Sequence, residues 1–220
     1  MATRFTNRTG GVSTGAFASL NLGLHVGDEA SSVRQNRASL EKAMGPIQFM
    51  NQVHGDRIAV IEAVTDVDPT CDALVTGIRN ISLAVQVADC IPLLLTSREV
   101  VAAVHVGRRG IVNEITRKTI NLMRDMGAQG IAAIIGPAIC GMCYEVSQDV
   151  YEEVITLHPF AESKTRQGTL ALDLPAALRS VLSDEGVGIV NKFTCTFEST
   201  DHFSYRRDGV TGRQAGIISL

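Results

Sequence analysis

Residues 81–106, with the sequence ISLAVQVADCIPLLLTSREVVAAVHV, determine the fold class of this chain. Three short apolar runs lie in this stretch, at 81–88, 92–96 and 100–105, and only a few residues separate them. Runs of this length that are rich in β-branched and other apolar residues predict β-strands. Because three strands follow one another with no helix between them, we expect an α+β fold, in which strands and helices do not strictly alternate.

The rest of the chain adds both kinds of element around this centre. Further strands are predicted at 47–53, 58–62, 131–135 and 192–197, and helices at 32–44, 111–126, 146–158 and 174–185. This order predicts mixed sheets with helices on their outer faces. No linker-like composition, low-complexity tract or internal repeat interrupts the sequence, so we expect one domain over residues 1–220.

The composition argues against several classes of protein. The formal net charge of -3 gives no broad attraction to nucleic acid or to an anionic membrane. The longest uncharged stretch, 126–144, is interrupted by glycines and by Pro137, so it does not predict a membrane-spanning helix. The first residues lack the apolar core of a secretory signal, and 5 cysteines, an odd number, favour a reducing compartment. We therefore expect a cytoplasmic protein, with monomer and homodimer both open.

Three predicted strand regions carry a residue that can bind a metal ion. These residues are His54 in NQVHG, Cys90 in VADCIP and His105 in AVHVG. Ligands that come from separate elements are typical of catalytic zinc sites, in which water or substrate takes the fourth position. Asp89 is expected to accept a hydrogen bond from one of the histidines. The same residues also fit a buried thiol with two hydrogen-bonded histidines, and spacing alone does not separate the two interpretations.

Arginines beside glycines form two further candidate sites. Arg8 precedes Gly10, Gly11 and Ser13, and Arg206 stands in a second glycine-containing loop, so backbone N–H groups and guanidinium forks could hold a phosphate. Tight turns and solvated arginines explain the same pattern.

Cys140 and Cys143 form a CxxC motif. No second close cysteine pair completes a structural zinc site, so we predict that the motif lies outside the metal site, and that the chain holds one zinc ion.

Several longer segments together resemble one known family. They are TNRTGGVSTGAFASLNLGLHVGD, NQVHG, VQVADCIPLLL, VAAVHVGRRG, IGPAICGMCYEV and FSYRRDGVTGRQAG, and they cover nearly the whole chain. The chain resembles the multicopper polyphenol oxidase, or laccase-domain, family of purine nucleoside phosphorylases, which includes peptidoglycan editing factors. The resemblance implies two packed mixed sheets with outer helices, similar to the catalytic domain of cytotoxic necrotizing factor.

The resemblance also implies a site and an activity. It implies zinc bound by His54, Cys90 and His105, and a pocket for purine nucleosides and phosphate. The implied reactions are phosphorolysis of adenosine, inosine and methylthioadenosine, and deamination of adenosine. His25, in a matching segment, joins Arg8, Ser13 and Arg206 as a candidate substrate residue. Val106 and Arg108 depart from the family pattern, which usually has a small residue and a tryptophan at these positions.

Three other functions use the same residues. A copper polyphenol oxidase would use copper in place of zinc, but 5 histidines are too few for a multicopper cluster. A cysteine hydrolase that edits peptidoglycan precursors would use Cys90 as the nucleophile and a histidine as the base. A metal-binding module without catalysis is the third.

Overall fold

The segment at residues 81–106 forms three consecutive strands, as predicted, in the computed structural model, which describes all residues 1–220. They are β5 (Ser82–Val87), β6 (Ile91–Thr96) and β7 (Val101–Val106). Strands β6 and β7 pair in antiparallel fashion, whereas β5 belongs to a different sheet. The chain therefore crosses from one sheet to the other between Val87 and Ile91, and Cys90 lies in this crossover.

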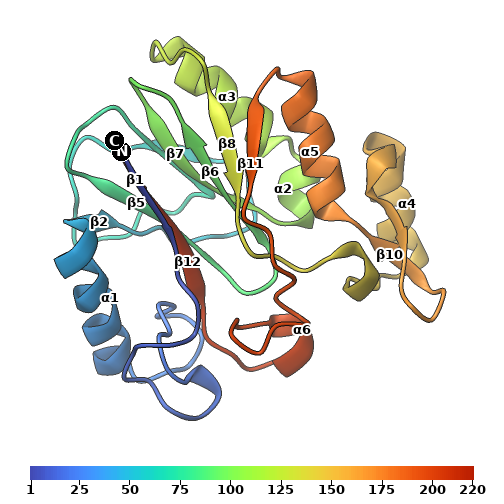
Figure 1. The fold of residues 1–220 in the computed structure, drawn as a ribbon, viewed down its shortest axis with the longest axis horizontal. Coiled ribbons are helices and arrows are strands. Elements are labelled where there is room, and N and C mark those ends of the chain that lie inside the picture. The colour runs from blue at the N-terminus through green and yellow to red at the C-terminus, as the bar shows by residue number, and fades with distance from the viewer.

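The two sheets are both mixed, as predicted (Figure 1). One has four strands in the order β1-β12-β5-β2 and the other has six in the order β11-β8-β6-β7-β4-β3. The remaining bounds are β1 (Ala2–Phe5), β2 (Ile47–Gln48), β3 (Ile58–Val60), β4 (Ala73–Thr76), β8 (Ala132–Ile135), β11 (Gly188–Asn191) and β12 (Gln214–Ser219). A separate hairpin joins β9 (Glu162–Lys164) and β10 (Leu170–Leu172). The two termini lie side by side because β1 pairs with β12.

Helices cover the outer faces of both sheets, which confirms the predicted architecture. The helices are α1 (Ala30–Met44), α2 (Arg108–Val112), α3 (Ile115–Asp125), α4 (Gln148–Leu157), α5 (Leu174–Asp184) and α6 (Tyr205–Asp208). A core of 26 buried residues joins the six-stranded sheet to α2, α3, α4 and α5, and a smaller core lies between the sheets. A third core packs α1 on the four-stranded sheet. None of the helices combines the length and the apolar character that crossing a bilayer requires.

Three predicted elements were wrong. The strand predicted at 47–53 spans only Ile47–Gln48, as β2. The helix predicted at 111–126 is two helices, because Glu114 takes a left-handed backbone conformation with φ of 60° between α2 and α3. The strand predicted at 192–197 is a loop, and β11 ends just before it at Asn191.

Strands β1, β4, β9, β10, β11 and β12 were not predicted. In β12, Gly216 suggests a turn from the sequence, but it packs so closely on Phe5 and Pro92 that a Cβ atom would come within 3.0 Å of Phe5. A glycine inside this strand therefore allows Phe5 and Pro92 to pack closely on it.

Candidate metal centre and pocket

The fold brings His54, Cys90 and His105 together at the end of the sheets where the chain crosses over. His54 follows β2, Cys90 lies in the crossover, and His105 is in β7. Their ligand atoms all lie within 4.8 Å of one another. The Nε2 atom of His54 is 3.9 Å from Sγ of Cys90, and the two imidazole rings meet edge to face at 4.6 Å. One sulfur and two nitrogens from three separate elements form a donor set that fits catalytic zinc.

A buried carboxylate that the sequence interpretation missed positions both histidines. Asp72 has no exposed surface, and its Oδ1 lies 2.8 Å from Nδ1 of His105. The same carboxylate accepts backbone N–H groups from Val53, His54 and Gly55. Because Nδ1 of His105 is held by Asp72, its Nε2 is left for a metal ion.

Asp89 does not accept a hydrogen bond from either histidine, and this prediction was wrong. Its two carboxylate oxygens accept hydrogen bonds from Oγ1 of Thr196 and from the backbone N–H of Arg206, both at 2.7 Å. Asp89 takes a backbone φ of 99°. Its role is to connect the crossover with the C-terminal segment that carries Arg206.

Gly107 leaves room for the metal centre. It precedes α2, and a Cβ atom at this position would lie 2.9 Å from Sγ of Cys90 and 3.3 Å from Cδ2 of His54. Both distances are shorter than ordinary carbon contacts, so any side chain here would displace the ligands.

Cys90 and His105 shift each other's pKa. Burial by itself raises the pKa of the Cys90 thiol, but the charge of His105 and hydrogen bonds from both histidines outweigh burial and lower this pKa to about 6. Burial lowers the pKa of His105, but the charge of Cys90 and the hydrogen bond with Asp72 raise it to about 9. In the metal-free protein the two groups therefore form a thiolate–imidazolium pair at neutral pH.

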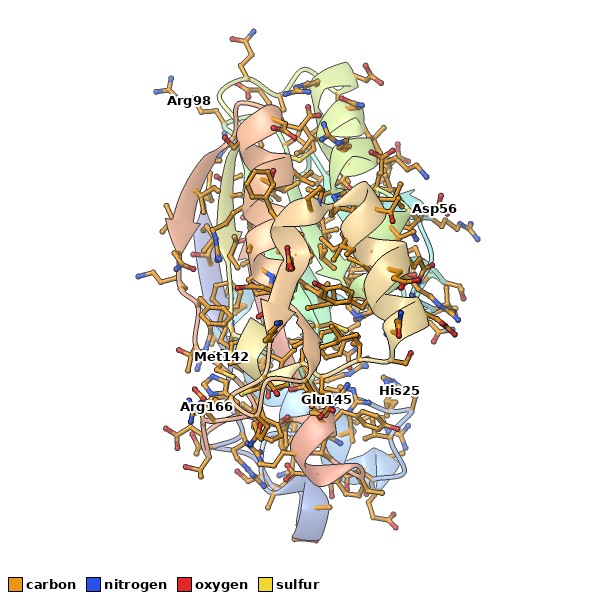
Figure 2. All side chains as sticks on the ribbon, turned by 90° about the vertical axis from the view of Figure 1, so that its right-hand side faces the viewer. His25, Asp56, Arg98, Met142, Glu145 and Arg166 are labelled. Carbon is orange, nitrogen blue, oxygen red and sulfur yellow. The ribbon has the colours of Figure 1, made fainter.

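A pocket of about 400 Å³ opens beside the three candidate ligands. It is lined by His25, Gln52, His54, Gln86, Val87, Ala88, Asp89, Cys90, His105, Ile139, Tyr144, Tyr205, Arg206 and Arg213. Figure 2 shows His25 and Glu145 near the same end of the molecule, below the outer helices. The guanidinium of Arg206 donates to the carbonyl of Glu145 at 2.8 Å and lies over the ring of Tyr144.

The structure divides the four predicted substrate residues into two groups. His25 and Arg206 line the pocket, whereas Arg8 and Ser13 do not. Arg8 donates from Nε to the carbonyl of Ala18 and lies over the ring of Phe203. Ser13 is buried and accepts a hydrogen bond from Asn36. Arg8 and Ser13 therefore organise the N-terminal loop.

Arg213 is a pocket cation that the sequence interpretation did not select. It belongs to the matching segment TGRQAG, but a lone arginine before a strand gives no local signal of its own. Its Nη1 donates to the carbonyls of Thr211 and Gly212 at 3.0 and 2.9 Å. Its Nε and Nη2 atoms make no hydrogen bond to the protein, and the residue is part of the pocket lining.

The two positions that depart from the family pattern lie outside the pocket lining. Val106 is fully buried in the core under the outer helices. Arg108 forms an ion pair with Glu153 of α4. Neither side chain therefore lines the space beside the metal ligands.

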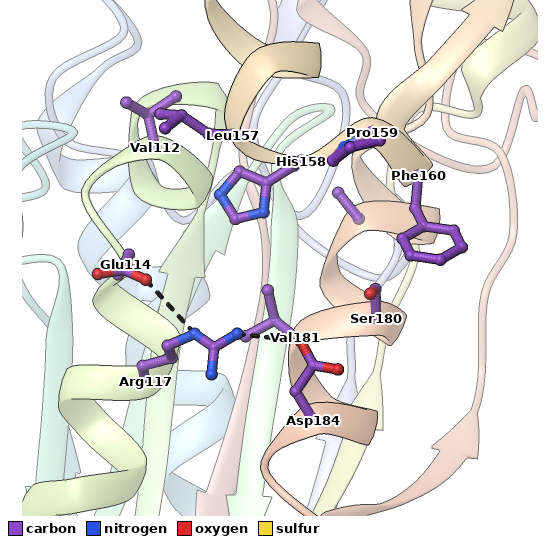
Figure 3. Close-up of a pocket in the computed structure, with 11 residues that line it drawn as sticks. Val112, Glu114, Arg117, Leu157, His158, Pro159, Phe160, Ser180, Val181 and Asp184 are labelled. Carbon is purple, nitrogen blue, oxygen red and sulfur yellow. Dashed lines mark hydrogen bonds and ion pairs between the residues drawn. The ribbon is translucent and has the colours of Figure 1, made fainter.

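A second hollow, of about 420 Å³, lies among the outer helices (Figure 3). Its cation, Arg117, is already paired with Glu114 at 3.4 Å, Asp184 at 3.1 Å and Glu185 at 2.7 Å. His158 is a further titratable residue there, and no cluster of metal ligands adjoins it. This hollow therefore lacks the candidate metal ligands that line the pocket beside Cys90.

Comparison with known proteins covers the whole chain. Residues 2–220 match the family model for multi-copper polyphenol oxidoreductase laccase. Proteins named purine nucleoside phosphorylase from Streptomyces coelicolor and Corynebacterium glutamicum are each 43% identical over 98% of this chain, and the match covers 94% and 93% of their lengths.

Solved structures agree with this match. A Neisseria meningitidis protein superposes with a TM-score of 0.90 at 40% identity, over 99% of this chain and 93% of that one. YlmD from Geobacillus stearothermophilus superposes with a TM-score of 0.88 at 33% identity, over 98% and 90%. The chain therefore belongs to the multi-copper polyphenol oxidoreductase laccase family.

Proposed function

We propose that this protein is a zinc-dependent purine nucleoside phosphorylase that also deaminates adenosine. The observation that carries the proposal is the set of three zinc-type ligands in the wall of a pocket that also presents Arg206 and Arg213. Two relatives that bear the name purine nucleoside phosphorylase, at 43% identity, support the substrate class. The substrates are then adenosine, inosine and methylthioadenosine, with inorganic phosphate as the second reactant.

The residues around the site fit a catalytic zinc ion. His54, Cys90 and His105 supply three ligands, and the pocket lies where a fourth ligand would enter. When bound, zinc lowers the pKa of a coordinated water to about 7 and polarises substrate oxygens. Asp72 keeps His105 in the tautomer that a metal ion requires.

We assign phosphate binding to Arg213. The two carbonyls that accept from its Nη1 orient the guanidinium, and the remaining donors form a fork suited to phosphate oxygens. In phosphorolysis a phosphate oxygen bonds to C1′ of the ribose as the bond from C1′ to the base breaks. The base leaves with that electron pair and takes up a proton, and the sugar leaves as ribose 1-phosphate.

We assign recognition of the base to Gln86. Its buried Oε1 atom has no hydrogen-bond partner although the residue lines the pocket. An unpaired buried acceptor costs about 1–3 kcal/mol. An N–H group of a purine would offset this cost once the side chain turns toward the pocket, because Oε1 exposes less than 1 Å² as it stands. Gln52 holds the backbone of Gln86 through two hydrogen bonds of 2.8 Å. In deamination a water oxygen bonds to C6 of adenosine and the bond from C6 to the amino nitrogen breaks. The nitrogen takes one proton from that water and leaves as ammonia.

Chromatography of products with and without phosphate tests this proposal. Purified protein is expected to release base from inosine only when phosphate is present, and to convert adenosine to inosine without phosphate. Release of base that does not depend on phosphate would indicate a hydrolase and would overturn the phosphorylase assignment.

One observation favours a second function, a cysteine hydrolase acting on peptidoglycan precursors. The thiolate of Cys90 is the nucleophile, His105 is the base that holds the proton of Cys90 as an imidazolium, and the carboxylate of Asp72 orients His105. This reading predicts activity that survives removal of all metal, whereas the phosphorylase predicts activity that chelation abolishes.

The copper oxidase alternative gains no support from the arrangement of histidines. His25, His54 and His105 line the pocket, but His158 lies among the outer helices and His202 pairs with Ser199. A second histidine-rich copper cluster therefore has no residues to build it.

A further inference from the structure

A second group of thiols lies outside the pocket. Cys195 approaches the CxxC motif, so that the sulfurs of Cys140, Cys143 and Cys195 all lie within 4.8 Å of one another. Cys195 is buried and the other two are partly buried. The sequence assigned no ligand role to the motif because Cys195 is 52 residues beyond Cys143 and forms no pair of its own.

The backbone is arranged to hold these sulfurs together. Gly141–Cys143 forms a single 3₁₀ turn in which the N–H of Cys143 donates to the carbonyl of Cys140 at 3.0 Å. A β-bridge between Ala138 and Cys195 brings the third thiol alongside the turn. The backbone N–H of Cys140 donates to Sγ of Cys195 at 3.4 Å, a contact that stabilises a sulfur carrying negative charge.

The distances suit a tetrahedral ion. A zinc–sulfur bond of about 2.3 Å places the sulfurs of a tetrahedral site about 3.8 Å apart. The sulfur–sulfur distances in the structure are at most 4.8 Å, about 1 Å longer than in a tetrahedral site. Rotation of the cysteine side chains can remove this difference. A fourth ligand is close by, since Oε1 of Glu198 lies 3.7 Å from Sγ of Cys143. Glu198 also pairs with Arg166 in the hairpin between β9 and β10.

We propose that Cys140, Cys143 and Cys195 bind a second zinc ion, with Glu198 as the fourth ligand. Three thiolates select a soft or borderline ion, and four protein ligands close the coordination sphere, as in structural zinc sites. A disulfide would use only two of the three thiols and would leave the third thiol unbonded.

The ion would connect two segments that build the pocket. The turn at 140–143 lies between Ile139 and Tyr144, which line the pocket, and Cys195 precedes the segment that carries Arg206. Figure 2 shows Met142, Arg166 and Glu145 close together at this end of the molecule. This site is therefore structural and positions the pocket wall, and it does not depend on the substrate proposed above.

The test counts zinc in the purified full-length protein and in matched variants. Wild-type protein, saturated with zinc and dialysed, is expected to hold about two zinc ions per chain, one at each thiolate site. Cys143→Ser and Cys195→Ser should each lose one of them, and Cys90→Ala should lose the other. Cys71→Ser, which alters a buried cysteine outside both groups, is the control and should keep both.

A second measurement needs no mutation and covers the case in which a variant fails to fold. Iodoacetamide labelling of the wild-type protein, read by peptide mass, should spare Cys140 and Cys143 until a chelator is added. If the Cys143 and Cys195 variants keep as much zinc as Cys71→Ser, the proposal is overturned. It is also overturned if labelling of the two thiols is the same with and without chelator, or if Cys140 and Cys143 are recovered as a disulfide.

Discussion

The carboxylate of Asp72 and the imidazole of His105 form a fully buried hydrogen bond of 2.8 Å that couples the six-stranded sheet to the metal centre. The two residues lie side by side because Asp72 directly precedes β4, His105 is in β7, and β4 pairs with β7. Asp72 also accepts the backbone N–H of His54, so a single carboxylate sets the positions of two candidate ligands.

Replacing Asp72 with Asn should weaken zinc binding about 10- to 100-fold, the usual effect of losing a residue that orients a metal ligand. The NH₂ group of the asparagine cannot accept a hydrogen bond, so it would repel some of the N–H donors of residues 53–55 and His105 that now bind the carboxylate. Competition with a coloured chelator measures the affinity. Asp56→Asn, a change at an exposed aspartate two residues from His54, is the control. Equal affinities of the two variants would contradict the role given to Asp72.

Replacing Gly107 with Ala should also weaken the metal site, with little effect on backbone conformation because φ is -91° there. The new methyl group would meet Sγ of Cys90 at 2.9 Å. Overpacking of this kind costs about 1–3 kcal/mol, or roughly 10- to 100-fold in affinity. Gly188→Ala is the matched control because a Cβ atom there meets nothing within 4 Å. Zinc content after dialysis compares the two, and an unaffected Gly107→Ala protein would show that the ligands adjust freely.

Replacing Arg213 with Gln should reduce phosphorolysis about 10- to 100-fold, the cost of a lost charged hydrogen bond, while adenosine deamination falls less. The Michaelis constant for phosphate should rise more than that for inosine. Arg8→Gln, at a residue that the sequence analysis proposed for phosphate binding, should change both activities by the same factor because Arg8 supports a loop. A larger effect on phosphate from Arg8 than from Arg213 would assign phosphate binding to Arg8 instead.

Alkylation of the metal-free protein should reveal the depressed pKa of Cys90. The thiolate is the reactive form, so the rate should rise with pH and reach half its maximum at about pH 6. Cys71 is an internal control, since burial raises the pKa of its thiol to about 11. Peptide mass spectrometry follows both residues in one experiment, and zinc should protect Cys90 throughout. A midpoint above pH 8 for Cys90 would mean that the histidines do not stabilise its thiolate.

Local patterns in the sequence determined the elements at the centre of the fold and the three candidate ligands. The strands at 81–106 are consecutive and apolar, so their identity follows from composition within a few residues. His54, Cys90 and His105 stand out because sulfur and imidazole at catalytic-type spacing are chemically distinctive. Neither inference needed knowledge of which strands become neighbours.

Only the tertiary structure decided which distant residues serve these ligands. Asp72 meets His105 because β4 pairs with β7, and Arg213 reaches the pocket because β12 pairs with β5 across more than a hundred residues of chain. Cys195 joins Cys140 through a bridge between two loops. The sequence alone does not show whether a given carboxylate, guanidinium or single thiol is exposed or buried. Burial and strand pairing give each its function, and both arise from contacts that no local pattern records.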